Sequence, residues 1–175
     1  PGIIFKDITP IFQDAQGLKQ SVDLFVDRWR DAGIDQVVGI ESRGFLLGGP
    51  VAYQLGIGLS LVRKVGKLPY TTIERSYELE YGSATLEVHI DAISKGQRVV
   101  ILDDLLATGG TMMATVELMR ELGAEVVEAA CLIELGFLPG RKVLSDAGVP
   151  TFCPIVFGGD DEELETRKHV AVSTS

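Results

Sequence analysis

Two adjacent acidic residues and a glycine-rich turn stand together near the middle of the chain. Asp103 and Asp104 directly follow an apolar segment at residues 98–102, and the sequence TGGT at residues 108–111 leads from there into a helical pattern. The N–H groups at the start of a helix point toward its N-terminal end and favour anions. Two glycines let the backbone approach a phosphate closely, and two threonines add hydroxyl donors. The segment therefore predicts a phosphate-binding turn.

The acidic pair in front of this turn indicates what the rest of the ligand would be. No lysine follows the glycines as it does in GxxxxGK[ST], and the spacing is not that of GxGxxG. Carboxylates repel a phosphate, but they accept hydrogen bonds from a pair of sugar hydroxyls. A phosphorylated ribose suits both halves of the segment. The alternative is that Asp103 and Asp104 only cap a strand-to-helix turn whose geometry the glycines relieve.

A second candidate anion site follows residues 36–40, which read as another strand. Ser42 and Arg43 stand between this strand and a helical pattern that begins near Gly44. Because this position is again the carboxyl end of a strand, we expect an anion to bind there. The alternative is an ordinary surface arginine after a strand.

Composition excludes several classes of protein. The chain has 175 residues, 46% of them hydrophobic, and a formal net charge of −9 at pH 7. This charge argues against a general nucleic-acid binder, and no apolar stretch approaches the roughly 20 residues of a membrane span. Charges are screened beyond about 8 Å, so the local cluster of Arg63, Lys64 and Lys67 can still attract an anionic substrate. Cys131 and Cys153 lack metal-ligand spacing and are predicted to be small buried thiols.

Strands and helices alternate along the chain, which is typical of an α/β fold with a parallel sheet. Five segments rich in β-branched residues are predicted to form the strands: 36–40, 59–63, 98–102, 126–133 and 151–157. Four segments are predicted to form helices: 18–32, 44–55, 111–122 and 138–147. Gly33 is expected to stop the first of these helices. We expect one domain, in which helices flank a five-stranded parallel core.

Residues 64–90 interrupt this alternation. They contain two short strand patterns, 71–79 and 84–90, around the turn residues Gly82 and Ser83. An excursion of this length between core strands is often a lid or a binding loop, although a hairpin without a function is the alternative. Residues 158–175 are polar and are expected to form a weakly packed tail.

Several segments resemble the adenine phosphoribosyltransferases, a family of the type I phosphoribosyltransferases. The phosphate-binding turn is similar to the motif with which type I members bind 5-phosphoribosyl 1-pyrophosphate (PRPP). Four other segments match the adenine family in order and spacing, namely GIIFKDITP at 2–10, ESRGF at 41–45, VRKVGKLP at 62–69 and YELEYG at 77–82. The resemblance extends from Pro1 to about Phe157. It implies the type I fold, with a purine hood at 1–12, a core at 17–63 and 91–157, and a flexible hairpin lid at 64–90.

The resemblance also implies a role for particular residues. The 5′-phosphate and ribose of PRPP would be bound by Asp103, Asp104, Ala107, Thr108, Gly109, Gly110 and Thr111. Pyrophosphate would lie against a loop of unusual backbone conformation and be bound by Ser42, Arg43, Lys67 and Tyr81, together with Arg63 from a neighbouring subunit. Adenine would be read by backbone groups of Ile4 and Lys6 and contacted by Leu105 and Leu135. Glu80 would be the catalytic residue, managing the proton that attack by N9 of the purine requires.

The implied reaction joins adenine and PRPP to give AMP and pyrophosphate, as in purine salvage. The resemblance implies Mg²⁺ that is held mainly by PRPP and water, with no direct protein ligand. It also implies a cytoplasmic homodimer. Two other functions stay open: transfer to another purine (hypoxanthine, guanine or xanthine), and a regulator that binds PRPP without catalysis. The absence of a helix-turn-helix pattern and the acidic charge favour an enzyme over a DNA-binding regulator.

Overall fold

The computed structural model describes residues 8–78, 82–158 and 165–166. The helices in these ranges are α1 (Thr9–Gln13), α2 (Ala15–Trp29), α3 (Arg43–Leu55), α4 (Gly110–Glu121) and α5 (Gly140–Asp146). The strands are β1 (Gln36–Ile40), β2 (Gly58–Lys64), β3 (Thr72–Glu78), β4 (Ser83–His89), β5 (Arg98–Leu106), β6 (Glu125–Leu135), β7 (Thr151–Phe152), β8 (Ile155–Phe157) and β9 (Glu165–Thr166).

All of these strands join one sheet. Its order is β3-β4-β2-β1-β5-β6-β8-β9, and β7 also pairs with β6. The central pairs β2–β1, β1–β5 and β5–β6 are parallel, as are the pairs of β6 with β7 and β8. This is the predicted parallel core, and antiparallel strands extend it at both edges.

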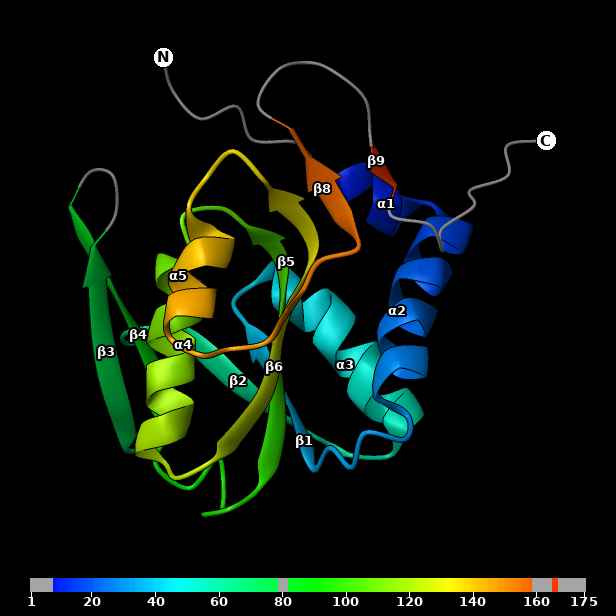
Figure 1. Ribbon diagram of the computed structural model, residues 1–175. Coiled ribbons are helices and arrows are strands. Elements are labelled where there is room, and N and C mark those ends of the chain that lie inside the picture. The colour runs from blue at the N-terminus through cyan, green and yellow to red at the C-terminus, as the bar shows by residue number, and fades with distance from the viewer. Residues whose placement is uncertain (1–7, 79–81, 159–164, 167–175) are drawn as a thin grey trace.

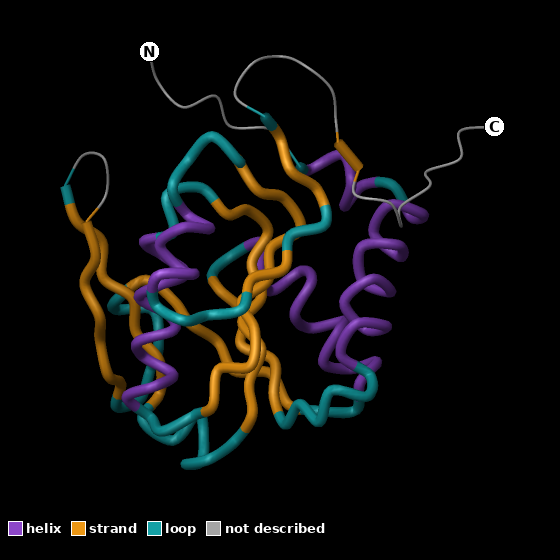
Figure 2. Tube along the Cα trace, viewed as in Figure 1, coloured by secondary structure: helices purple, strands orange, loops and turns teal. Residues whose placement is uncertain are grey.

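Helices cover both faces of the sheet (Figures 1 and 2). Along β5, Val99 and Ile101 pack in a cluster with α4 and α5, whereas Val100 and Leu102 pack in a second cluster with α2 and α3. Side chains of a strand alternate between the two faces of its sheet, so an unbroken apolar run implies burial on both. The result is a three-layer α/β/α arrangement in which helices cover the faces of the sheet and loops follow the ends of its strands.

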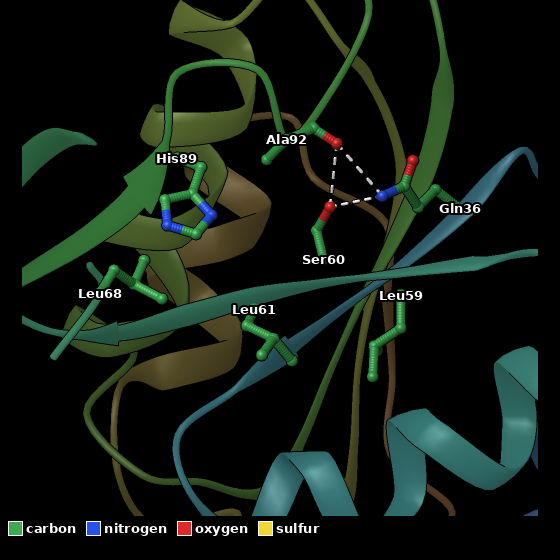
Figure 3. A pocket seen from close by; sticks show the side chains of 7 residues that line it. All are labelled: Gln36, Leu59, Ser60, Leu61, Leu68, His89 and Ala92. Atoms are coloured by element: carbon green, nitrogen blue, oxygen red, sulfur yellow. Dashed lines mark hydrogen bonds between the residues drawn. The ribbon is translucent and has the colours of Figure 1, made fainter. Parts of the chain in front are cut away.

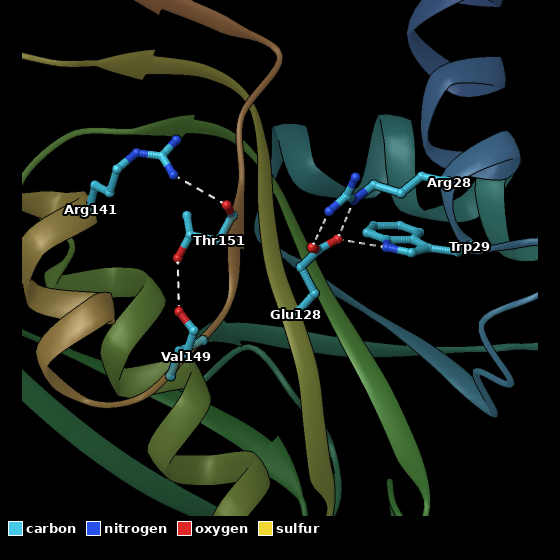
Figure 4. A network of polar contacts seen from close by, with 6 residues as sticks. All are labelled: Arg28, Trp29, Glu128, Arg141, Val149 and Thr151. Carbon is cyan, nitrogen blue, oxygen red and sulfur yellow. Dashed lines mark hydrogen bonds and ion pairs between the residues drawn. The ribbon is translucent and has the colours of Figure 1, made fainter.

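An ion pair between a buried carboxylate and an exposed arginine fixes α2 to the sheet (Figure 4). Glu128 of β6 accepts hydrogen bonds from the Arg28 guanidinium at 2.7 and 2.6 Å and from Trp29 Nε1 at 2.9 Å. These bonds satisfy a carboxylate that is only 8% exposed. The α2 helix itself begins after Asp14, whose side chain accepts a hydrogen bond from the Gly17 N–H and so caps the helix.

Two strand predictions need correction. The segment 98–102 continues as β5 to Leu106, so Asp103 and Asp104 lie inside the strand and not after it. Within the strand, Asp103 is in register with Cys131 of β6. The segment 151–157 divides into β7 and β8 around Pro154. Proline has no N–H to donate to a neighbouring strand, which explains the interruption.

The helix predictions are confirmed in place and type, with shifted ends. The first helix ends at Trp29 instead of residue 32, and Gly33, with φ of +64°, lies in the turn that follows. Cys131 and Cys153 are buried free thiols, as predicted. Among the described residues, no helix combines the length and the apolar character that crossing a membrane requires.

The predicted hairpin at 64–90 forms part of the sheet. Its strands β3 and β4 pair antiparallel from Thr72↔His89 to Glu78↔Ser83. The second strand, β4, also pairs with the end of β2, and β3 lies beside α4. The hairpin is therefore anchored along its length at one edge of the molecule (Figure 1). Its closing motion as a lid stays a prediction.

Candidate active site

The loops that follow β2, β1 and β5 meet at one edge of the molecule. These strands are neighbours in the sheet, and parallel strands end on the same side. The basic cluster lies at the end of β2 and in the loop after it, the Ser42–Arg43 turn follows β1, and the glycine-rich turn follows β5. In open α/β sheets, ligands bind in the crevice outside the carboxyl ends of the strands. The fold thus brings together three segments that are far apart in the sequence.

The glycine-rich turn has the backbone shape that an anion site needs. Helix α4 begins at Gly110, and its N-cap residue Gly109 has φ of +89°, which strongly favours glycine. Gly109 has no side chain to cap the helix, so no N-cap side chain accepts a hydrogen bond from the N–H groups of the first turn. The turn that was predicted to bind phosphate therefore lies at the start of a twelve-residue helix, and its binding of phosphate stays a prediction.

The start of α5 supports this turn from behind. The Gly140 N–H donates to the Ala107 carbonyl oxygen at 3.0 Å. A Cβ on Gly140 would lie 2.4 Å from that same oxygen, and one on Gly109 would lie 2.9 Å from the Gly140 Cα. Two backbones can come this close only without side chains between them. Sequence reasoning did not identify Gly140, because nothing near residue 140 indicates its contact with residues 107–109.

The hairpin contacts the turn from the other side. Thr111 Oγ1 donates a hydrogen bond to the Tyr77 hydroxyl oxygen at 2.9 Å. A Cβ on Gly110 would lie 2.9 Å from Cδ2 of the Tyr77 ring. Tyr77 on β3 therefore positions both the backbone and a hydroxyl of the predicted phosphate site.

We expect Tyr77→Phe to raise the KM for PRPP by roughly three- to tenfold, the value of one neutral hydrogen bond. The phenylalanine ring would still pack against Gly110, so folding should be unchanged. Steady-state kinetics with varied PRPP measures the effect. Tyr70→Phe is the control, because Tyr70 is 61% exposed. A KM equal to that of the unsubstituted protein would contradict this role for the Tyr77 hydroxyl.

The acidic pair is linked directly to the Ser42–Arg43 turn. Asp104 is 4% exposed, and its Oδ2 lies 2.5 Å from Arg43 Nε. Asp103 is partly buried, and its Oδ1 accepts from the Asp104 N–H at 2.8 Å. Burial, followed by the neighbouring Asp104 carboxylate, raises the pKa of Asp103 well above its usual range. Arg43 and Asp104 thus connect the two predicted anion sites.

The turn at residues 41–44 lies tightly against β5. The Glu41–Ser42 peptide bond is cis, consistent with the unusual backbone conformation expected there. A Cβ on Gly44 would lie 2.7 Å from the Leu102 carbonyl oxygen and 3.1 Å from Asp103 Oδ1. Glycine at this position therefore allows α3 to start directly beside the acidic pair.

Arg63, expected to reach a neighbouring subunit, has partners within its own chain. It donates to Glu41 Oε1 at 2.9 Å and to the Lys67 carbonyl oxygen at 3.2 Å. The hydrogen bond from Arg63, together with one from the Lys64 N–H at 3.0 Å, lowers the pKa of Glu41. Glu41 was not predicted as a site residue, since the sequence shows its carboxylate but not the residue that pairs with it.

Of the predicted adenine contacts, Leu105 and Leu135 lie near the carboxyl ends of β5 and β6, which are neighbouring parallel strands. Leu105 is half-buried on β5, and Leu135 at the end of β6 is 1% exposed. The predicted adenine contacts Ile4 and Lys6, with Glu80 and Tyr81 of the hairpin, fall outside the residues that the structure describes.

One cavity of about 260 Å³ lies elsewhere (Figure 3). It is lined by Gln36, Leu59, Ser60, Leu61, Leu68, His89 and Ala92. Gln36 begins β1, so the cavity extends to the amino end of that strand, away from the Ser42–Arg43 turn. Gln36 and Ser60 bind each other and the Ala92 carbonyl oxygen there. None of the described residues predicted to bind PRPP lines this cavity.

The fold and the sequence together place this chain among the phosphoribosyltransferases. A family model described as phosphoribosyl transferase domain matches residues 9–157. An adenine phosphoribosyltransferase of Cupriavidus necator is 52% identical over 159 residues, which cover 91% of this chain and 84% of the relative. The chain belongs to the adenine phosphoribosyltransferase family.

Solved structures agree with this assignment. The adenine phosphoribosyltransferase of Thermoanaerobacter pseudethanolicus has a TM-score of 0.85 and 48% identity, with 89% of this chain and 90% of the other covered. The enzyme of Saccharomyces cerevisiae, solved with an imino-altritol bisphosphate and adenine, has a TM-score of 0.81 and 42% identity, with 87% of each chain covered.

Proposed function

We propose that this protein transfers the 5-phosphoribosyl group of PRPP to N9 of adenine, forming AMP and pyrophosphate. The observation that best supports this function is the ion pair between Arg43 and Asp104. It links the acidic pair and the predicted phosphate-binding turn after β5 to the second predicted anion site, which follows the neighbouring strand β1. PRPP has a phosphate, two ribose hydroxyls and a pyrophosphate in a fixed order along one molecule. Adenine as the acceptor is supported by the names of the relatives and by the yeast enzyme solved with adenine.

Binding and orientation would provide most of the catalysis. The turn at 107–111 would hold the 5′-phosphate, while Asp103 and Asp104 would accept hydrogen bonds from the ribose hydroxyls. The pyrophosphate leaving group would be held by Ser42, Arg43, Lys67 and Tyr81 of one chain, together with Arg63 of the partner subunit. Holding both ends of PRPP fixes the reacting carbon between them and stabilises the charge that leaves.

We propose that Mg²⁺ accompanies PRPP. Asp103 and Asp104 offer two carboxylates, and the described residues contain no group of three or more His, Cys, Asp or Glu placed to hold a metal ion. We propose that Mg²⁺, a hard cation that prefers oxygen ligands, takes them mainly from PRPP and water. When bound, Mg²⁺ would neutralise part of the charge on the pyrophosphate.

Glu80 is proposed to manage the proton at the purine. Replacing it with alanine is expected to lower kcat at least about tenfold, because a positioned acid or base usually contributes 10²–10⁴-fold. Circular dichroism should show unchanged folding. Glu74→Ala, at an exposed position on β3, is the control. Turnover within a few-fold of normal in Glu80→Ala would remove Glu80 from this role.

Base specificity is tested by pyrophosphate release from PRPP with adenine, hypoxanthine, guanine and xanthine in turn. Adenine should be the preferred acceptor. Exclusive use of an oxopurine would overturn the proposed acceptor while keeping the PRPP site. PRPP binding with no turnover on any base would favour the regulator instead.

We also infer a homodimer in the cytoplasm. Large apolar side chains are exposed on α3, on β2 and just after β2, and these two elements are adjacent in the fold: Leu46, Tyr53, Leu61 and Val65. Covering such a surface is a common reason for association. The reduced thiols of Cys131 and Cys153 suit a reducing compartment. Light scattering of the purified protein tests the dimer, and a monomeric mass would contradict it.

A further inference from the structure

A buried carboxylate on β4 binds the backbone of the loop at residues 65–71, which carries Lys67. Glu87 is 3% exposed. Its Oε1 accepts hydrogen bonds from the Lys67 and Leu68 N–H groups, each at 2.7 Å, and its Oε2 accepts from Thr72 Oγ1 at 3.3 Å. One side chain therefore holds the loop that leads from β2 to β3 at two consecutive peptide groups.

Burying a carboxylate lowers the stability of the folded protein unless the carboxylate is hydrogen-bonded. Burial alone would raise the pKa of Glu87, but hydrogen bonds from the Leu68, Lys67 and Gly66 N–H groups and from Thr72 hold it below its usual range. The charged form is therefore the form that binds the loop. Breaking these bonds would leave a buried charge without partners, which keeps the loop in place.

The same loop is held from the other side by Arg63. Its guanidinium donates to the Lys67 carbonyl oxygen at 3.2 Å and is itself anchored by Glu41 at 2.9 Å. Both the N–H and the carbonyl of Lys67 are thus bound, by residues of two different strands. Val65 is fixed as well, through its N–H to the Thr85 carbonyl oxygen at 3.0 Å.

This arrangement concerns the residue whose side chain is proposed to bind pyrophosphate. A lysine side chain has four rotatable bonds, and ordering a mobile loop as well would reduce the affinity that its charge can contribute. A backbone fixed in advance leaves only the side chain to be ordered. Functional groups need such support from surrounding residues to be held in place.

We propose that Glu87 is a positioning residue for PRPP, which fixes the Lys67 backbone so that the Lys67 ammonium group is presented to the pyrophosphate. This inference rests on the proposed function. The competing explanation is that Glu87 only stabilises the β2–β4 pairing, in which it is in register with Arg63. The two explanations differ in whether the effect of Glu87 passes through Lys67.

A double-mutant cycle with Glu87→Ala and Lys67→Ala distinguishes them, with the PRPP dissociation constant measured by calorimetry without a purine base. We expect Glu87→Ala alone to weaken PRPP binding about tenfold. In the Lys67→Ala background the same change should cost less than twofold, because the side chain to be positioned is gone. Equal losses in both backgrounds would overturn the proposal.

Hydrogen exchange supplies a second readout that does not depend on activity. The Lys67 and Leu68 amides should exchange faster in Glu87→Ala, and unchanged exchange would contradict the contact on which the proposal depends. Glu128→Ala is the matched control, because Glu128 is a buried acid bound to α2 whose loss should leave PRPP affinity within twofold. If Glu87→Ala does not fold, Glu87→Gln replaces it, since glutamine keeps one acceptor oxygen. The double-mutant cycle of Glu87→Gln with Lys67→Ala then distinguishes the two explanations.

These outcomes are separate from the identity of the acceptor base. Should the unsubstituted protein bind PRPP but not use adenine, the proposed function fails while the cycle still tests Glu87. Should the protein use adenine and the cycle be additive, Glu87 loses its positioning role while the proposed function stands.

Discussion

Gly109→Ala is expected to lower kcat/KM for PRPP by more than about 100-fold, because it displaces the turn that binds the phosphate. Gly109 has φ of +89°, and a Cβ there would lie 2.9 Å from the Gly140 Cα and 3.1 Å from the Gly140 carbonyl oxygen. Both neighbouring atoms belong to backbone, so no side chain can rotate away. The turn or the start of α5 has to move, and the N–H groups directed at the phosphate move with it.

Gly96→Ala separates this displacement from backbone strain. Gly96 has φ of +87°, but its Cβ would meet nothing within 4 Å. Gly96→Ala should lose about 1–2 kcal/mol of stability, the cost of a left-handed conformation in a residue other than glycine, and Gly109→Ala should lose at least as much. Thermal unfolding measures this loss, and steady-state kinetics with varied PRPP measures activity. Equal kinetic losses in the two variants would show that strain alone, and not displacement of the turn, is responsible.

The arrangement of the core could be predicted from the sequence because its signals are local. An apolar run such as 98–102 shows by itself that a strand is buried on both faces, and the glycines at 109 and 110 show that a turn follows. The predicted end of this strand at residue 102 was wrong for a physical reason. Asp103 and Asp104 look like the start of a loop, but pairing with a long β6 keeps them in the strand as far as Leu106.

The contacts that support the site could not be predicted in the same way. Tyr77 binds Thr111, Gly140 binds Ala107, and Glu87 binds the loop at Lys67. Each joins two segments well separated along the chain, and each depends on how strands and helices pack. A tyrosine or a glutamate on a hairpin looks the same whether it faces solvent or a neighbouring loop. Sequence reasoning therefore identified the residues proposed to touch PRPP more readily than the residues that hold them.

Asp104→Asn is expected to lower kcat/KM for PRPP by about 100-fold, since it removes charge-assisted hydrogen bonds of two kinds. The carboxylate binds Arg43 Nε at 2.5 Å and is proposed to accept a ribose hydroxyl. Asparagine keeps the shape of the side chain but not its charge. Arg43 would then lose the group that holds it beside the PRPP turn.

The loss should therefore appear for both halves of the ligand. Calorimetry should show weaker binding of pyrophosphate alone, through Arg43, as well as weaker binding of ribose 5-phosphate, through the hydroxyl contact. Glu128→Gln weakens the ion pair of a buried carboxylate with Arg28 on the α2 side of the sheet. It should change neither affinity, although it should lower the melting temperature. If Asp104→Asn weakened ribose 5-phosphate only, Arg43 would not depend on Asp104, and the two anion sites would act independently.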